Sequence, residues 1–223
     1  MNSFITNMFD LTGQYYEDYD YNFIVESSKF TDEEINKYWV DFAMVKGLSG
    51  IIKPTSDMPM IIVGSKGSGK THIMKHFSFS SQTLRWKNDI ISGLKKDGYL
   101  GTYLRCSGLN GFKFKNNGES DSENWQLIFS YYLELWLSQL LLKNVIKILE
   151  DKSLVIANEH TIALEILDLL DTTEVSQNVK SFSHLVKYFN DLQKGIDYAI
   201  NNKAFTRKNV SESVEILASP GSL

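Results

Sequence analysis

The spacing of hydrophobic and polar residues predicts a chain made mostly of helices. Apolar residues recur at helical spacing in residues 31–48, 71–79, 82–96, 125–150, 159–171 and 181–201. Thr31 and Glu34 have the spacing of a capping box, which marks the start of the first of these helices. Gly98 follows the third helix at a position where glycine commonly ends a helix.

Shorter segments have the pattern of β-strands. Residues 60–63 form a continuous apolar run of the kind found in a buried parallel strand, and residues 99–105 and 210–218 are further strand candidates. A strand followed by a glycine-rich turn and a helix is typical of α/β proteins. We therefore expect an α/β fold in which helices flank a parallel sheet.

The most apolar stretch, residues 125–142, is nearly long enough to raise the question of a membrane span. Its polar residues recur at helical spacing down one face of the predicted helix: Gln126, Ser130, Glu134, Ser138 and Gln139. A polar stripe of this kind favours a largely buried helix in a soluble protein. We therefore expect no membrane segment.

The glycine-rich turn carries the clearest chemical signal. Residues 64–71 fit G-x-x-x-x-G-K-[ST] at every specified position, directly after the apolar run and before a helix. In such a loop the glycines allow close approach of the backbone, and successive N–H groups form a nest for an anion at the start of the helix. The lysine, Lys70, would reach the β- and γ-phosphates of a nucleotide, and the hydroxyl of Thr71 would bind Mg²⁺.

The motif defines the predicted site. Lys70 and Thr71 are the candidate catalytic residues, and Thr71 is the candidate Mg²⁺ ligand. The candidate nucleotide-binding residues are Gly64, Ser65, Lys66, Gly67, Ser68, Gly69, Lys70, Thr71 and His72. The predicted domain organisation follows: residues 1–30 form a tyrosine-rich N-terminal arm, and residues 31–223 form a P-loop NTPase domain with a helical insertion at about 125–203.

Two weaker patterns have simpler explanations. His72 and His76 are four residues apart, which is metal-ligand spacing, but no glutamate lies at position 73 and no third ligand follows. A shared surface face of one helix explains both. In residues 112–115 two lysines alternate with two phenylalanines, as in some single-stranded nucleic-acid sites, but an ordinary anchored loop is the better interpretation.

A hydrolysing P-loop protein also needs an acidic residue at the end of a second apolar strand. Residues 154–159 have Asn158 where an aspartate is required, and residues 146–151 continue a helix. The run at residues 214–217 ends in Ala218. None of these segments fits the pattern.

The composition excludes several classes of protein and of site. A formal net charge of −4 argues against a surface built to hold nucleic acid, and only three arginines argue against the arginine-rich lid of a small-molecule kinase. The single cysteine, Cys106, excludes an internal disulfide and offers no zinc site. Without a signal-peptide pattern at the start, we expect a cytoplasmic protein.

The order of these features resembles bacterial Orc/Cdc6-like AAA-type ATPases, which are related to the AAA+ and STAND classes and in several cases occur in anti-phage defence loci. The resemblance covers about residues 31–223 and rests on Tyr38-Trp39-Val40-Asp41, the loop at 64–71, residues 99–106, the helix that begins at Trp125 and the SPGSL segment at 219–223. It implies binding of ATP and Mg²⁺, with Lys70 and Thr71 as the matching residues, and a protein partner or homo-oligomer.

The resemblance further implies that the acidic Mg²⁺ strand follows a segment such as residues 219–223. We therefore expect the chain to be the amino-terminal part of a longer ATPase, with an incomplete sheet. Two functions remain open at this stage: an ATPase subunit that couples its nucleotide cycle to a multiprotein complex, or a regulatory module that binds nucleotide without hydrolysis. Adenine is favoured by the resemblance, and no guanine-type N/T-K-x-D motif is present.

Overall fold

The computed structural model describes residues 30–39, 52–56, 58–105, 114, 122–151, 158–170, 179–206, 214, 216, 217 and 223. The chain divides into two compact units between Tyr103 and Leu104. Each unit is described below by itself. The predicted arm lies outside the described residues except for Phe30.

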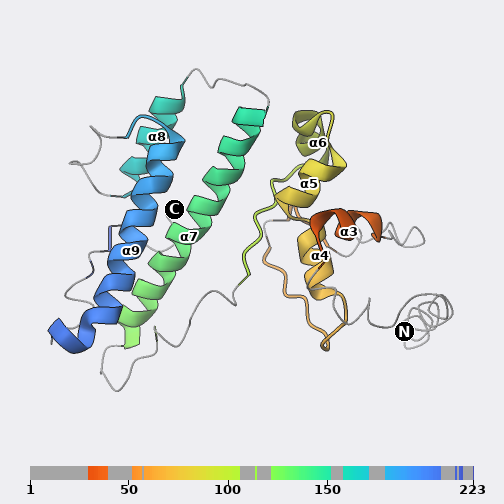
Figure 1. Ribbon diagram of the computed structural model, residues 1–223. Coiled ribbons are helices and arrows are strands. Elements are labelled where there is room, and N and C mark those ends of the chain that lie inside the picture. Colours follow the sequence, from red (N-terminus) through yellow and green to blue (C-terminus); the bar gives the residue numbers. More distant parts are fainter. Residues whose placement is uncertain are drawn as a thin grey trace. The chain divides into compact units, whose positions relative to one another are not determined.

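The first unit contains short helices (Figure 1): α3 (Asp32–Lys37), α4 (Lys70–His76), α5 (Phe79–Arg85) and α6 (Ile90–Asp97). Of these, α4 begins at Lys70, within the motif. Helix α3 packs against α4 and α5, and α5 also packs against α6. The predicted capping box at the start of α3 is confirmed. Thr31 N donates to Glu34 Oε2 over 2.8 Å, and Glu34 N donates to Thr31 Oγ1 over 3.2 Å.

Three helix predictions in this unit need correction. The helix predicted at 71–79 ends at His76, and Phe79 begins α5. Helix α3 ends at Lys37 with Tyr38 as its C-cap, earlier than predicted, and residues 40–48 lie outside the described residues. The single helix expected at 82–96 is two helices, because Asp89 accepts a hydrogen bond from Ser92 N and so starts α6 with its own N-cap. Gly98 ends α6 in the left-handed conformation, as predicted.

The predicted parallel sheet is wrong for the residues that the structure describes, which include helices but no strand. Residues 60–63 have no regular secondary structure, and Ile61 is 89% exposed and Val63 is 87% exposed. Apolarity predicts burial, but a strand also needs a neighbour that pairs with its N–H and C=O groups. Among the described backbone hydrogen bonds, none involves residues 60–63. The one made by residues 99–105 runs from Phe79 N, at the start of α5, to the Gly101 carbonyl, so neither segment pairs as a strand.

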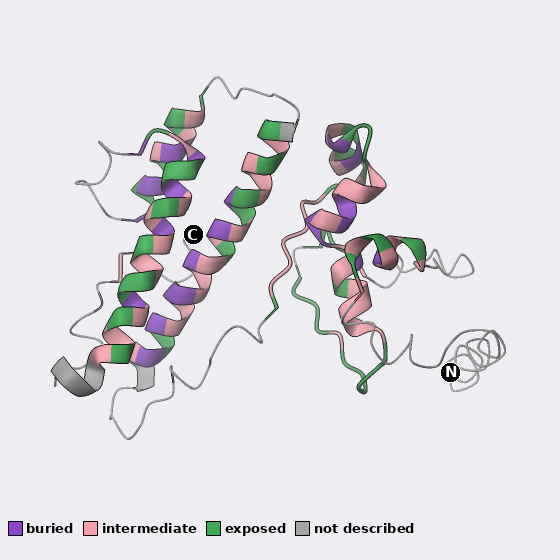
Figure 2. Cartoon of the chain, viewed as in Figure 1, coloured by how far each residue is buried: buried purple, intermediate pink, exposed green. Residues whose placement is uncertain are grey.

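The second unit is a helical bundle of α7 (Ser122–Asp151), α8 (Glu159–Asp168) and α9 (Phe182–Thr206), in which α7 and α8 each pack against α9 (Figure 1). The three long helical patterns are thereby confirmed. Figure 2 shows buried positions that recur along α7 and α9. The described side chains of this unit with at most 1% exposure are Ile128, Leu135, Ala163, Leu167, Leu170, Leu185 and Phe189.

Polar contacts tie this bundle together as well. Gln139, the only residue of the predicted polar stripe that is buried among the described side chains, donates from Nε2 to Gln193 Oε1 over 3.0 Å. Tyr132 donates its hydroxyl hydrogen to Asp197 Oδ2 over 3.3 Å. These two hydrogen bonds link α7 to α9 at two positions along the helices. Across the described residues, no helix is long and apolar enough to cross a membrane.

Segments outside the helices also contribute to this core. Val214, Ile216 and Leu217 come from the predicted strand at 210–218, but they pack against the bundle without strand structure. Phe114 is buried, with its ring against Phe129 and Tyr132 at centroid distances of 5.2 and 5.1 Å. This residue of the 112–115 pattern is therefore used for packing, and its three neighbours lie outside the described residues.

Candidate functional site

The glycine-rich motif forms one largely exposed loop that leads into α4. Gly67 and Gly69 adopt φ angles of 87° and 81°, and a Cβ at either position would meet no atom within 4 Å. The backbone conformation, rather than lack of space, is therefore the reason for glycine at these positions. A Cβ at Gly64 would lie 2.5 Å from Ser68 Oγ, so glycine there leaves room for the Ser68 side chain.

The Lys70 side chain folds back over this loop. Its Nζ donates to the carbonyl oxygens of Gly64 and Ser65, both over 2.6 Å, and lies 3.3 Å from Ser68 Oγ. An ammonium group has three N–H donors and no acceptor, so these oxygens match its full capacity. A charged donor in this position is able to exchange backbone oxygens for the more strongly accepting oxygens of a phosphate.

The remaining predicted residues lie on either side of this lysine. Ser65 and Lys66 are exposed in the loop, and Thr71 and His72 are partly buried in the first turn of α4. The predicted residues are close together because they are consecutive in the sequence. What the structure adds is the orientation of Lys70 and the set of contacts that hold α4.

Helix α4 is held by residues that flank α3 in the sequence, Phe30 and Trp39. The Trp39 ring stacks on His76, with centroids 3.4 Å apart and planes within 3°, and lies 5.7 Å from the His72 ring. Lys75 Nζ donates to the Phe30 carbonyl over 2.8 Å. The two histidines therefore face Trp39, and the predicted surface face is wrong, since His76 is buried. No group of three potential metal ligands occurs within the described part of the chain.

Burial lowers the pKa of His72 below its ordinary value of 6.5, a hydrogen bond with the Ile35 backbone opposes this shift, and the nearby charge of Lys75 adds to it. The neutral ring is therefore the form that packs against Trp39. At a pH between the lowered pKa of His72 in the folded chain and its ordinary pKa of 6.5 in the unfolded chain, the unfolded chain binds more protons at this histidine than the folded chain does. Stability linked to His72 is thus present at higher pH and is lost as the pH falls below about 6.5.

We expect the urea midpoint of the protein to decrease between pH 7.5 and pH 5.5, and part of this decrease to come from His72. In His72→Phe, which keeps a ring beside Trp39 without a titrating group, the decrease should be smaller. His160→Gln, at an exposed position of α8, should leave the full decrease. An identical pH dependence in wild type and His72→Phe would show that His72 does not carry the effect.

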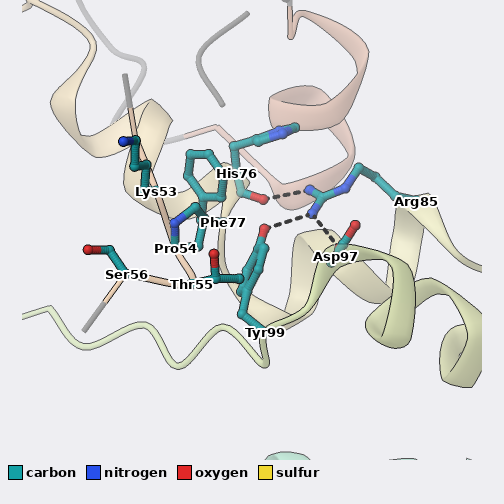
Figure 3. Close-up of a pocket in the computed structure, with 9 residues that line it drawn as sticks. All are labelled: Lys53, Pro54, Thr55, Ser56, His76, Phe77, Arg85, Asp97 and Tyr99. Carbon is teal, nitrogen blue, oxygen red and sulfur yellow. Dashed lines mark hydrogen bonds and ion pairs between the residues drawn. The ribbon is translucent and has the colours of Figure 1, made fainter. Parts of the chain in front are cut away.

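The opposite end of α4 borders a separate hollow of about 600 Å³ (Figure 3), lined by Lys53, Pro54, Thr55, Ser56, His76, Phe77, Arg85, Asp97 and Tyr99. Arg85 donates from Nη1 to the His76 carbonyl over 2.6 Å, and its Nη2 lies 3.6 Å from Asp97 Oδ2. Asp97 also accepts hydrogen bonds from Gln82 and Trp86. Arg85 thus satisfies the carbonyl end of α4 with its charge compensated, and no residue of the motif lines this hollow.

Glu159, next to the Asn158 that stands in place of an acidic strand end, has a structural role. Its Oε1 accepts a hydrogen bond from Phe182 N over 2.8 Å, so this carboxylate caps the start of α9. Asn158 is the N-cap residue of α8. Residues 146–151 belong to α7, as the helical pattern predicted. These roles are structural. Within the described residues of 146–151, 154–159 and 214–217, no carboxylate lies on a strand.

Sequence reasoning missed two residues of this region. Trp39 lies in the helix predicted at residues 31–48 and in a segment of the family resemblance, but neither pattern predicts that it packs on α4. The i, i+4 spacing of His72 and His76 predicts a shared helix face but not the residue that covers it. Ser68 occupies a motif position at which any residue is allowed, so the pattern gives it no role.

Comparison with known proteins identifies one family. The family model described as ORC-CDC6-like matches residues 26–223, which is most of the chain. No curated protein and no solved structure matches the chain.

Proposed function

We propose that this chain, which belongs to the ORC-CDC6-like family of AAA-type ATPases, binds ATP with Mg²⁺ through residues 64–71. Nucleotide and Mg²⁺ dependence is a general property that the family implies. The observation that carries the assignment to this loop is the Lys70 ammonium, held across the motif by loop oxygens at 2.6 Å.

The residues of the loop fit a polyphosphate. The left-handed conformations at Gly67 and Gly69 shape an exposed backbone that a chain of phosphates can approach closely. Lys70 supplies a positive charge at that backbone. Mg²⁺ keeps several waters and binds through few protein ligands together with phosphates, and the Thr71 hydroxyl is the ligand that this loop would supply.

In this proposal the chain contributes positioning and charge. Bound Mg-ATP would supply the phosphoanhydride bond whose hydrolysis drives the cycle. The loop N–H groups would hold the phosphates, Lys70 would neutralise their charge, and the Thr71 hydroxyl would orient the metal. Coupling of this cycle to an oligomer or an associated protein complex, and a setting in anti-phage defence, are supported by the resemblance alone.

The alternative is a module that binds nucleotide without hydrolysing it. Its support from the sequence is that no segment has an apolar strand that ends in an acidic residue. In the structure, Glu159 accepts a hydrogen bond from the backbone N–H of Phe182. A phosphate-release assay separates the two functions: steady release that depends on Mg²⁺ favours the ATPase, and tight binding without release favours the module.

The proposal is tested by titration of the chain with Mg-ATP, Mg-ADP and AMP in a calorimeter. Because the loop recognises the β- and γ-phosphates, we expect ATP and ADP to bind, and AMP to bind at least about 100-fold more weakly. GTP in the same series tests the preference for adenine. Equal affinity for AMP and ATP, or no binding of any nucleotide, would contradict the proposal.

A further inference from the structure

The Lys70 ammonium meets two kinds of oxygen in the loop. The carbonyls of Gly64 and Ser65 belong to the backbone and are present whatever the side chains are. The third contact, over 3.3 Å, is the hydroxyl of Ser68. It is the side-chain contact of Lys70 among those described, and therefore the contact that a substitution can remove without changing the backbone.

Ser68 has a specific place across the loop. Its hydroxyl lies over Gly64, so close that a Cβ at position 64 would come within 2.5 Å of the Oγ atom and within 3.2 Å of the Ser68 Cβ. Ser68 is also exposed, which leaves its side chain little role in burying apolar surface. The loop thus brings this hydroxyl to the lysine at a position where packing does not require serine.

We propose that Ser68 is a positioning residue for Lys70: its hydroxyl holds the ammonium over the loop in the place where phosphate is bound. A free lysine side chain has several rotatable bonds, and fixing it costs rotamer entropy. A contact that restricts the lysine before the ligand arrives reduces this cost at binding. The hydroxyl accepts a hydrogen bond from the ammonium but carries no charge. It therefore holds the lysine more weakly than a phosphate would, and a bound phosphate is able to replace it.

This inference rests on the proposed nucleotide function and deepens it. The role of Ser68 also explains the glycine at position 64, because any side chain there would displace the Ser68 hydroxyl from Lys70. Alanine at position 68 removes the hydroxyl alone, and threonine retains it.

The test compares wild type, Ser68→Ala and Ser68→Thr by calorimetric titration with Mg-ATP, with the urea midpoint of each variant measured alongside. Ser68→Ala should weaken binding about threefold to tenfold, as expected for one hydrogen bond to a charged group at an exposed site. Ser68→Thr should restore most of the affinity, and the urea midpoints should agree. Ser92→Ala, at an exposed position of α6 away from the loop, should bind as wild type does.

The outcomes separate this inference from the function on which it rests. If wild type binds Mg-ATP and Ser68→Ala binds equally well, the positioning role is wrong and the function stands. If Ser68→Ala and Ser68→Thr are equally weakened, or if the urea midpoint of Ser68→Ala falls with its affinity, the serine supports the loop structure and the positioning role is again wrong. If wild type does not bind, both proposals fail.

Discussion

Replacement of Lys70 by alanine is expected to lower the affinity for Mg-ATP by about 100-fold or more. The variant removes the charge that the loop holds at Gly64 and Ser65, and leaves the phosphates without their main positive partner. Calorimetric titration of wild type and variant under the same conditions measures the loss. An affinity within about threefold of wild type would place the phosphates elsewhere.

Two other lysines serve as comparisons for this result. Lys66 carries the same charge in the same loop but is exposed, so Lys66→Ala should lose no more than about fivefold. Lys95 is an exposed residue of α6 outside the loop, and Lys95→Ala should retain the wild-type affinity. The order of losses tests whether the position of Lys70 matters, because all three variants change the net charge equally.

Replacement of Gly101 by alanine should destabilise the first unit by about 3 kcal/mol, at the upper end of the range for overpacking. A Cβ at this position would overlap the backbone carbonyl oxygen of Phe77, which follows α4 directly. The residue is fixed on both sides, since its carbonyl accepts from Phe79 N over 2.7 Å and its N–H donates to Gln82 Oε1 over 2.9 Å. A shift of Gly101 away from Phe77 would therefore strain its hydrogen bonds with Phe79 and Gln82.

The matched control for Gly101 is a glycine with open surroundings. Gly195 lies inside α9, and a Cβ there would meet no atom within 4 Å. Gly195→Ala should therefore stabilise the protein by about 0.5–1 kcal/mol through helix propensity. Urea unfolding followed by circular dichroism should show midpoints that move in opposite directions. A Gly101→Ala midpoint equal to that of wild type would contradict the close packing at the end of α4.

The features that were predictable from the sequence are local ones. The loop follows from eight consecutive residues, and the helices of the second unit follow from apolar residues at helical spacing over long segments. The start of α3 was also predictable, because both partners of its capping box lie within four residues. In each case the interacting groups are close in sequence.

The features that were missed depend on distant partners. Residues 60–63 have the composition of a buried strand, but their exposure in this structure depends on which segments lie beside them. Trp39 contacts His72 and His76 through tertiary packing that no local pattern encodes. The break between α5 and α6 was missed because the Asp89 cap outweighed the continuous helical pattern.

Binding of the ATP phosphates by residues 64–71 is the basis of the proposed function. Hydrogen–deuterium exchange of the whole chain with and without Mg-ATP tests it most directly, because it reports where bound nucleotide protects backbone N–H groups. We expect slower exchange in the peptides that cover residues 64–71 and the first turn of α4, and loss of this protection in Lys70→Ala. Saturable binding of ATP with protection confined to other segments would contradict it.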